Sequence, residues 1–118
     1  DGLDEISTMG PTDVLWLDDG RITERTIVPE DFGMGRASLE ELRGGDAATN
    51  AAIIRAILAG QERGRRKDIV VLNAAAAIMV AGLADDFPDG IAQADQAIQD
   101  GRARNALERL VALSNQTA

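Results

Sequence analysis

A β-hairpin pattern between residues 14 and 28 constrains the fold of this chain more tightly than any other feature. Two stretches rich in apolar and β-branched residues, 14–17 and 22–28, flank Asp18-Asp19-Gly20. A two-residue type I′ turn needs positive φ at both central residues, and Asp-Gly adopts it readily. This turn predicts a register in which Leu17 faces Ile22 and Trp16 faces Thr23. We assign the hairpin a structural role.

Capping residues predict where the helices after the hairpin begin. Ser38 is the expected N-cap of a short helix at residues 39–43. Asp46 is the expected N-cap of the next helix, which ends at Gly60. A carboxylate at that position would repel phosphate, so the Gly-Gly pair before it indicates a cap rather than a phosphate-binding loop. One face of this helix is predicted to carry Ala47, Ala51, Ile54 and Leu58.

The longest apolar stretch, residues 69–81, is predicted to be a helix capped by Asp68 and buried on nearly all sides. Asn73 is the one polar residue inside it. A buried amide must be hydrogen-bonded, so we interpret Asn73 as a structural tie to a neighbouring loop or helix end, with a ligand role as the alternative. Residues 61–67, with basic side chains at 63, 65, 66 and 67, are predicted to be a solvated connector, with a nucleic-acid patch as the alternative.

Two more helices are expected near the C-terminus. Asp86 is the predicted cap of the first, which Gly101 closes. The second covers residues 103–113, and residues 114–118 are expected to form a frayed tail. The predicted inner face of the first helix carries Ile91, Ala94 and Ile98.

Composition restricts the chemistry and the partners. The chain has 118 residues, 20 acidic against 12 basic, and a net charge of −8, which argues against nucleic acid and anionic membranes as partners. It has no Cys and no His, so thiolate metal sites and imidazole catalysis are excluded. No signal peptide or membrane-spanning stretch is recognisable, and a cytoplasmic location is expected.

The first seven residues are the candidate functional stretch: a Gly-containing turn, the carboxylates of Asp4 and Glu5, and the apolar Ile6, which is expected to enter a strand. Neighbouring side chains on an extended strand point to opposite faces, whereas in a loop at a strand end the two carboxylates could converge. Oxygen ligands of this kind suit Mg²⁺, which keeps several waters and often binds substrate phosphates. A solvated acidic surface is the alternative.

The sequence resembles the anthranilate phosphoribosyltransferase family of tryptophan biosynthesis. The resemblance covers nearly the whole chain but only the C-terminal third of the family. Since no Met opens the chain, we expect it to be a segment of something longer. Four blocks in the family's order carry the resemblance: Gly2-Leu3-Asp4-Glu5-Ile6-Ser7, Pro29-Glu30-Asp31-Phe32-Gly33-Met34, Gly44-Gly45-Asp46-Ala47 with Asn50-Ala51, and residues 68–77.

The resemblance implies an α/β fold (α+β as a fragment). A short antiparallel hairpin would precede four to five packed helices, and residues 1–118 would form a single domain, the C-terminal part of a nucleoside-phosphorylase/phosphoribosyltransferase-type catalytic domain. It also implies Mg²⁺ binding by Asp4 and Glu5, with phosphoribosyl pyrophosphate and anthranilate as the substrates of the complete enzyme. The family's Gly-rich diphosphate loop, anthranilate-binding residues and N-terminal helical domain have no counterpart here. We therefore expect no activity from the chain alone.

Two other interpretations stay open. The chain could be a non-catalytic acidic α+β binding or scaffold module, or an unrelated small α+β protein that shares these motifs. Surface left uncovered by the missing neighbours is expected to promote self-association.

Overall fold

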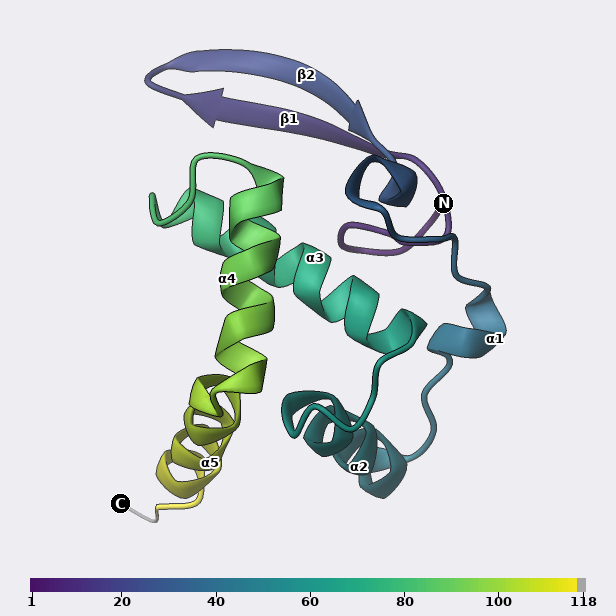
Figure 1. Ribbon diagram of the computed structural model, residues 1–118, viewed down its shortest axis with the longest axis vertical. Coiled ribbons are helices and arrows are strands. Elements are labelled where there is room, and N and C mark those ends of the chain that lie inside the picture. The colour runs from purple at the N-terminus through teal and green to yellow at the C-terminus, as the bar shows by residue number, and fades with distance from the viewer. Residues whose placement is uncertain (117–118) are drawn as a thin grey trace.

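A hairpin lies over a set of helices in the computed structural model, which describes residues 1–116 (Figure 1). Within that part, a two-stranded sheet and five α-helices form the arrangement expected from the sequence. None of the helices described is long and apolar enough to cross a membrane. The elements are β1 (Thr12–Asp18), β2 (Arg21–Ile27), a 3₁₀ turn (Pro29–Phe32), α1 (Leu39–Leu42), α2 (Ala47–Leu58), α3 (Arg65–Val80), α4 (Phe87–Gln99) and α5 (Arg102–Ser114).

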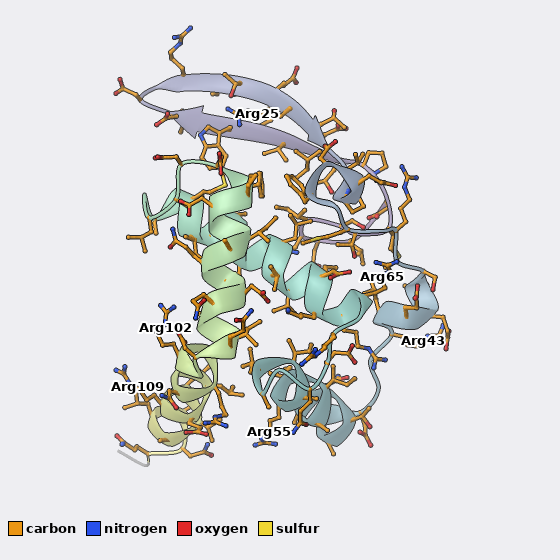
Figure 2. The ribbon with its side chains drawn as sticks, in the orientation of Figure 1. Arg25, Arg43, Arg55, Arg65, Arg102 and Arg109 are labelled. Atoms are coloured by element: carbon orange, nitrogen blue, oxygen red, sulfur yellow. The ribbon has the colours of Figure 1, made fainter. Side chains whose placement is uncertain are left out.

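The hairpin has the predicted register. Leu17 pairs with Ile22 and Trp16 with Thr23, and both residues of the turn have positive φ, 44° at Asp19 and 75° at Gly20. The inner face of the hairpin packs on the core, where the Arg25 guanidinium lies 5.9 Å from the centroid of the Trp16 ring (Figure 2). The outer face is open to solvent: its apolar residues Leu15, Leu17 and Ile22 are about 70% exposed.

The crossing of α3 and α4 forms the centre of the molecule. Leu72 and Ala75 of α3 are fully buried, and Gly90 of α4 lies directly against Ala75. A Cβ atom on Gly90 would lie 2.9 Å from the carbonyl oxygen of Ala75, so only glycine allows the helices to come this close. Phe87, at the start of α4, packs on Phe32 with ring centroids 5.0 Å apart and joins the helices to the hairpin side.

Three of the four predicted caps, at Ser38, Asp46 and Asp86, are confirmed. The Ser38 hydroxyl accepts from the Glu41 backbone N–H, and the Glu41 carboxylate accepts from the Ser38 N–H at 2.8 Å. Asp46 accepts from the Thr49 N–H at 2.8 Å, and Asp86 caps α4 by accepting a backbone bond of 2.9 Å. These contacts are local, so the sequence contains both partners of each.

The start of α3 differs from the prediction. The helix begins at Arg65, and its N-cap is Gly64, whose carbonyl oxygen accepts the N–H groups of Lys67 and Asp68. Asp68 is therefore in the first turn rather than at the cap. No proline or glycine interrupts residues 65–68, and an ion pair of 3.2 Å between Arg65 and Asp68 stabilises that turn. Residues 65–67 of the predicted basic connector are thus helical, and residues 61–64 precede the helix.

The predicted burial of two helices, α2 and α3, is also wrong in part. The predicted inner face of α4 is correct, but α3 leaves Val80 77% exposed, because other elements cover only part of its circumference. In α2, Ile57 is buried and Ile54 exposed, since the helix is rotated away from the predicted face. The leucines of α5 are mostly exposed. Ser114 belongs to α5 rather than to a frayed tail, and the end of that predicted tail, 117–118, lies outside the described residues.

Candidate functional site

The acidic pair lies in the N-terminal loop, residues 1–11, which precedes β1. The chain bends at Asp4 and Glu5, and both side chains are exposed. Together with Leu3 and Ile6 they line a hollow of about 230 Å³ whose other wall is the first half of α3, at Ile69, Val70 and Asn73. The pair thus stands at an open hollow between a loop and a helix.

Ile6 does not enter a strand, contrary to the sequence prediction. Its backbone pairs with a side chain instead: the Ile6 N–H donates to Asn73 Oδ1 at 3.0 Å, and Asn73 Nδ2 donates to the Ile6 carbonyl oxygen at 2.8 Å. Asn73 Nδ2 also donates to the Ile69 carbonyl oxygen at 2.9 Å. The predicted structural tie at Asn73 is confirmed, and it is made to the loop that carries the acidic pair.

Asp1 closes the same loop from its other side. One of its carboxylate oxygens accepts from the Leu3 N–H at 3.1 Å, and the other accepts from the Ser7 hydroxyl. Ser7 and Thr8 are buried, and the Thr8 carbonyl oxygen accepts from the Ala37 N–H at 2.9 Å. The roles of Asp1 and Ser7 as supports of the loop were not predicted from the sequence. One sequence signal was available. An Asp side chain often accepts a hydrogen bond from the backbone N–H two residues later, here that of Leu3, and this is the Asx-turn pattern.

The donor set of the loop fits a hard divalent cation. Asp4 and Glu5 offer carboxylate oxygens only, and Mg²⁺ binds in this way through one or two carboxylates together with waters and phosphate oxygens. In residues 1–116 no group of three or more His, Cys, Asp or Glu side chains could hold a metal. Most of the coordination shell would therefore come from water and substrate.

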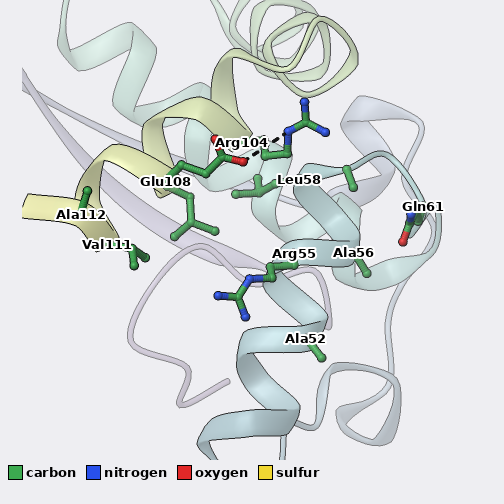
Figure 3. Close-up of a pocket in the computed structure, with 11 residues that line it drawn as sticks. Ala52, Arg55, Ala56, Leu58, Gln61, Arg104, Glu108, Val111 and Ala112 are labelled. Atoms are coloured by element: carbon green, nitrogen blue, oxygen red, sulfur yellow. Dashed lines mark ion pairs between the residues drawn. The ribbon is translucent and has the colours of Figure 1, made fainter. Parts of the chain in front are cut away.

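A groove of about 630 Å³ lies at the other end of the molecule, between α2 and α5 (Figure 3). Its floor is mainly apolar, with Leu58, Leu107 and Val111 among the lining residues. Arg104 and Glu108 form an ion pair of 3.8 Å at its side. None of the residues that the sequence analysis singled out for chemistry lies there.

The basic residues near the start of α3 are engaged within the molecule. Arg65 lies beside α1 and pairs with Asp68 (Figure 2). Arg66 donates to the Arg43 carbonyl oxygen at 2.9 Å, and Lys67 forms an ion pair with Asp95 of α4. These contacts hold α1 and α4 against α3, which is a structural role.

Comparison with known proteins gives a consistent result over nearly the whole chain. Residues 1–104 match the family described as "Glycosyl transferase family, a/b domain". The anthranilate phosphoribosyltransferase of Methylobacterium radiotolerans is 53% identical over 115 residues, which are 98% of this chain and 33% of that protein.

Solved structures agree with the sequence comparison. The crystal structure of anthranilate phosphoribosyltransferase from Thermus thermophilus matches 94% of this chain and 32% of its own, with a TM-score of 0.82 and 37% identity. The Saccharomyces cerevisiae protein in complex with PRPP and Mg matches 91% of this chain and 31% of its own, with a TM-score of 0.79 and 27% identity. The chain thus spans about a third of the length of these relatives.

Proposed function

Because this chain belongs to the glycosyl transferase family, a/b domain, we propose that it supplies the C-terminal third of an anthranilate phosphoribosyltransferase. The complete enzyme would transfer phosphoribosyl from phosphoribosyl pyrophosphate to anthranilate in tryptophan biosynthesis, in the cytoplasm. Residues 1–118 would form one part of its catalytic domain. The observation that carries this proposal is the 53% identity over 98% of the chain, which leaves no segment of any length outside the resemblance.

In this proposal Asp4 and Glu5 hold Mg²⁺ beside the diphosphate. When bound, the ion would neutralise negative charge on the departing diphosphate without any proton transfer. The chain has no His, which fits a segment whose task is charge neutralisation rather than proton transfer. The yeast relative in complex with PRPP and Mg supports the choice of cation.

The isolated chain is expected to be inactive. Its acidic pair faces an open hollow, and it lacks counterparts of the Gly-rich diphosphate loop and the anthranilate-binding residues expected of the family. Anthranilate fluorescence, measured with the purified chain, Mg²⁺ and both substrates, should decay no faster than the blank. Turnover above the blank would contradict the fragment interpretation.

The metal role is tested in the full-length enzyme with the variant Asp4→Asn plus Glu5→Gln. We expect the Mg²⁺ concentration for half-maximal rate to rise at least about tenfold, since two anionic ligands are lost. The matched control is Glu24→Gln plus Asp85→Asn, which removes the same charge from exposed positions outside the hollow. An unchanged Mg²⁺ dependence in the first variant would remove the assignment.

A further inference from the structure

We propose that Asn73 is a positioning residue for the acidic pair: by holding the Ile6 backbone it fixes the orientation of Asp4 and Glu5 and thereby sets the metal affinity of the loop. This inference rests on the proposed function. Asn73 touches neither carboxylate in the hydrogen bonds described, but it lines the same hollow as both of them.

The amide of Asn73 has one orientation available to it. Its oxygen accepts the Ile6 N–H, and its nitrogen donates to two carbonyl oxygens, those of Ile6 and Ile69. Turning the amide over would set its NH₂ group against the Ile6 N–H and its oxygen against the two carbonyls. The bond to Ile69 lies within α3, so the side chain is fixed to the helix before it meets the loop. We call this set of three hydrogen bonds the Asn73 clamp.

The Asn73 clamp acts on the peptide unit next to the pair. The Ile6 N–H belongs to the planar Glu5–Ile6 peptide, so holding it restrains the orientation of that peptide relative to α3. Asp1 fixes the opposite side of the loop through Leu3 and Ser7. These two supports restrain the backbone on both sides of the exposed bend at Asp4 and Glu5. Ordering a flexible loop costs conformational entropy and would weaken the affinity of the loop for a cation. Because the backbone is already held, a cation that binds here avoids that cost.

The chemistry selects Asn at this position. An Asp could accept the Ile6 N–H but would present an oxygen to the two carbonyls, and Ala would make none of the three bonds. A second Asn supplies a matched comparison: Asn50 Oδ1 accepts the Gly45 N–H at 2.8 Å, and Asn50 Nδ2 donates to the Gly45 carbonyl oxygen at 3.1 Å. Asn50 thus makes the same two backbone bonds, but to a loop that carries no part of the proposed site.

The test uses the full-length enzyme, with Mn²⁺ as an electron paramagnetic resonance probe and inorganic pyrophosphate present. We expect Asn73→Ala to raise the Mn²⁺ dissociation constant about 10- to 100-fold, the range seen for residues that orient metal ligands. Asn50→Ala should leave it unchanged. At saturating Mg²⁺ the kcat of Asn73→Ala should recover. A merely structural defect would instead lower kcat and leave the Mg²⁺ dependence as it was.

Asn73→Asp separates position from charge. If only charge mattered, a third carboxylate at the hollow would tighten Mn²⁺ binding; if the Asn73 clamp matters, binding weakens despite the added charge. Tighter binding would overturn the inference. Should Asn73→Ala fail to fold, Asn73→Ser, whose hydroxyl can keep one bond, must show a weaker effect of the same sign.

The two proposals fail in different ways. If Asp4→Asn plus Glu5→Gln binds Mn²⁺ as the wild type does, the metal role of the pair falls and the role of Asn73 falls with it. If that variant loses Mn²⁺ but Asn73→Ala binds it normally, only the positioning role is overturned.

Discussion

At the start of α2, the Asp46 carboxylate accepts a hydrogen bond from the Thr49 backbone N–H, and this bond is the main reason why the pKa of Asp46 lies below its usual value. The pKa of Glu41 is lowered in the same way, first by the Ser38 backbone and then by the Ser38 side chain. Both carboxylates therefore stabilise the folded chain in their ionised form.

These shifts predict a pH dependence with a definite sign. A folded-state pKa below the unfolded one gives stability that is present above about pH 4 and is lost as the pH falls through the folded pKa. Asp46→Asn keeps a capping side chain but should lose that part of the pH dependence, whereas Asp46→Ala should be less stable at neutral pH. Thermal unfolding at pH 7 and pH 3 measures both effects. A wild-type chain whose acid sensitivity equals that of Asp46→Asn would contradict this account.

Single residues also show which contacts could be predicted from the sequence and which could not. The caps at Ser38, Asp46 and Asp86 were predictable because each side chain bonds a backbone group three residues away. The partner of Asn73 was not, because 67 positions separate it from Ile6. The sequence predicted a buried amide that needs hydrogen-bond partners, and only the fold supplies those partners.

At the scale of elements, the close crossing of α3 and α4 depends on the pair Gly90 and Ala75. Gly90→Ala should destabilise the chain. The new Cβ meets backbone atoms that cannot move cheaply, and such overpacking costs about 1–3 kcal/mol. The better helix propensity of Ala returns at most about 1 kcal/mol.

Denaturant unfolding measures this cost, with Gly10→Ala as the control. Gly10 has no atom within 4 Å of its added Cβ and no left-handed φ, so this substitution should leave stability unchanged or slightly raised. Equal stability of the two variants would show that the crossing can open to admit a methyl group.

For the helices and strands, the sequence predicted the type and the order but not every buried face. The type and order of the helices followed from caps and periodicity, and the hairpin register followed from its turn. The faces of α2 and α3 did not, since alanine-rich helices are apolar on several sides and only their neighbours decide which side is covered. The N-cap at Gly64 could not be predicted either, because glycine has no side chain to cap the helix and only its backbone takes part.

At the scale of the whole molecule, the outer face of the hairpin leaves apolar side chains open to solvent. Leu15, Leu17 and Ile22 form a row of exposed apolar side chains on a sheet of only two strands, both of which have a free edge. Exposed apolar faces and free strand edges tend to be covered by association. We therefore predict that the isolated chain self-associates reversibly.

Sedimentation at several concentrations tests this prediction. The mean mass should rise with concentration, and Leu15→Lys plus Leu17→Lys should reduce the rise. The control Val80→Lys plus Leu83→Lys places the same charges on exposed apolar positions outside the hairpin, at the end of α3 and in the loop that follows it. A strict monomer at high concentration would contradict the prediction, because the exposed apolar face of the hairpin would then be stable in water without self-association.

The N-terminal loop and the end of α5 lie at opposite corners of the molecule (Figure 1). A purification tag or fluorophore attached beyond α5 would stand clear of the acidic bend, whereas one attached at Asp1 would lie beside the loop that carries the bend. Immobilisation for surface-based titrations should accordingly be made through the carboxyl end.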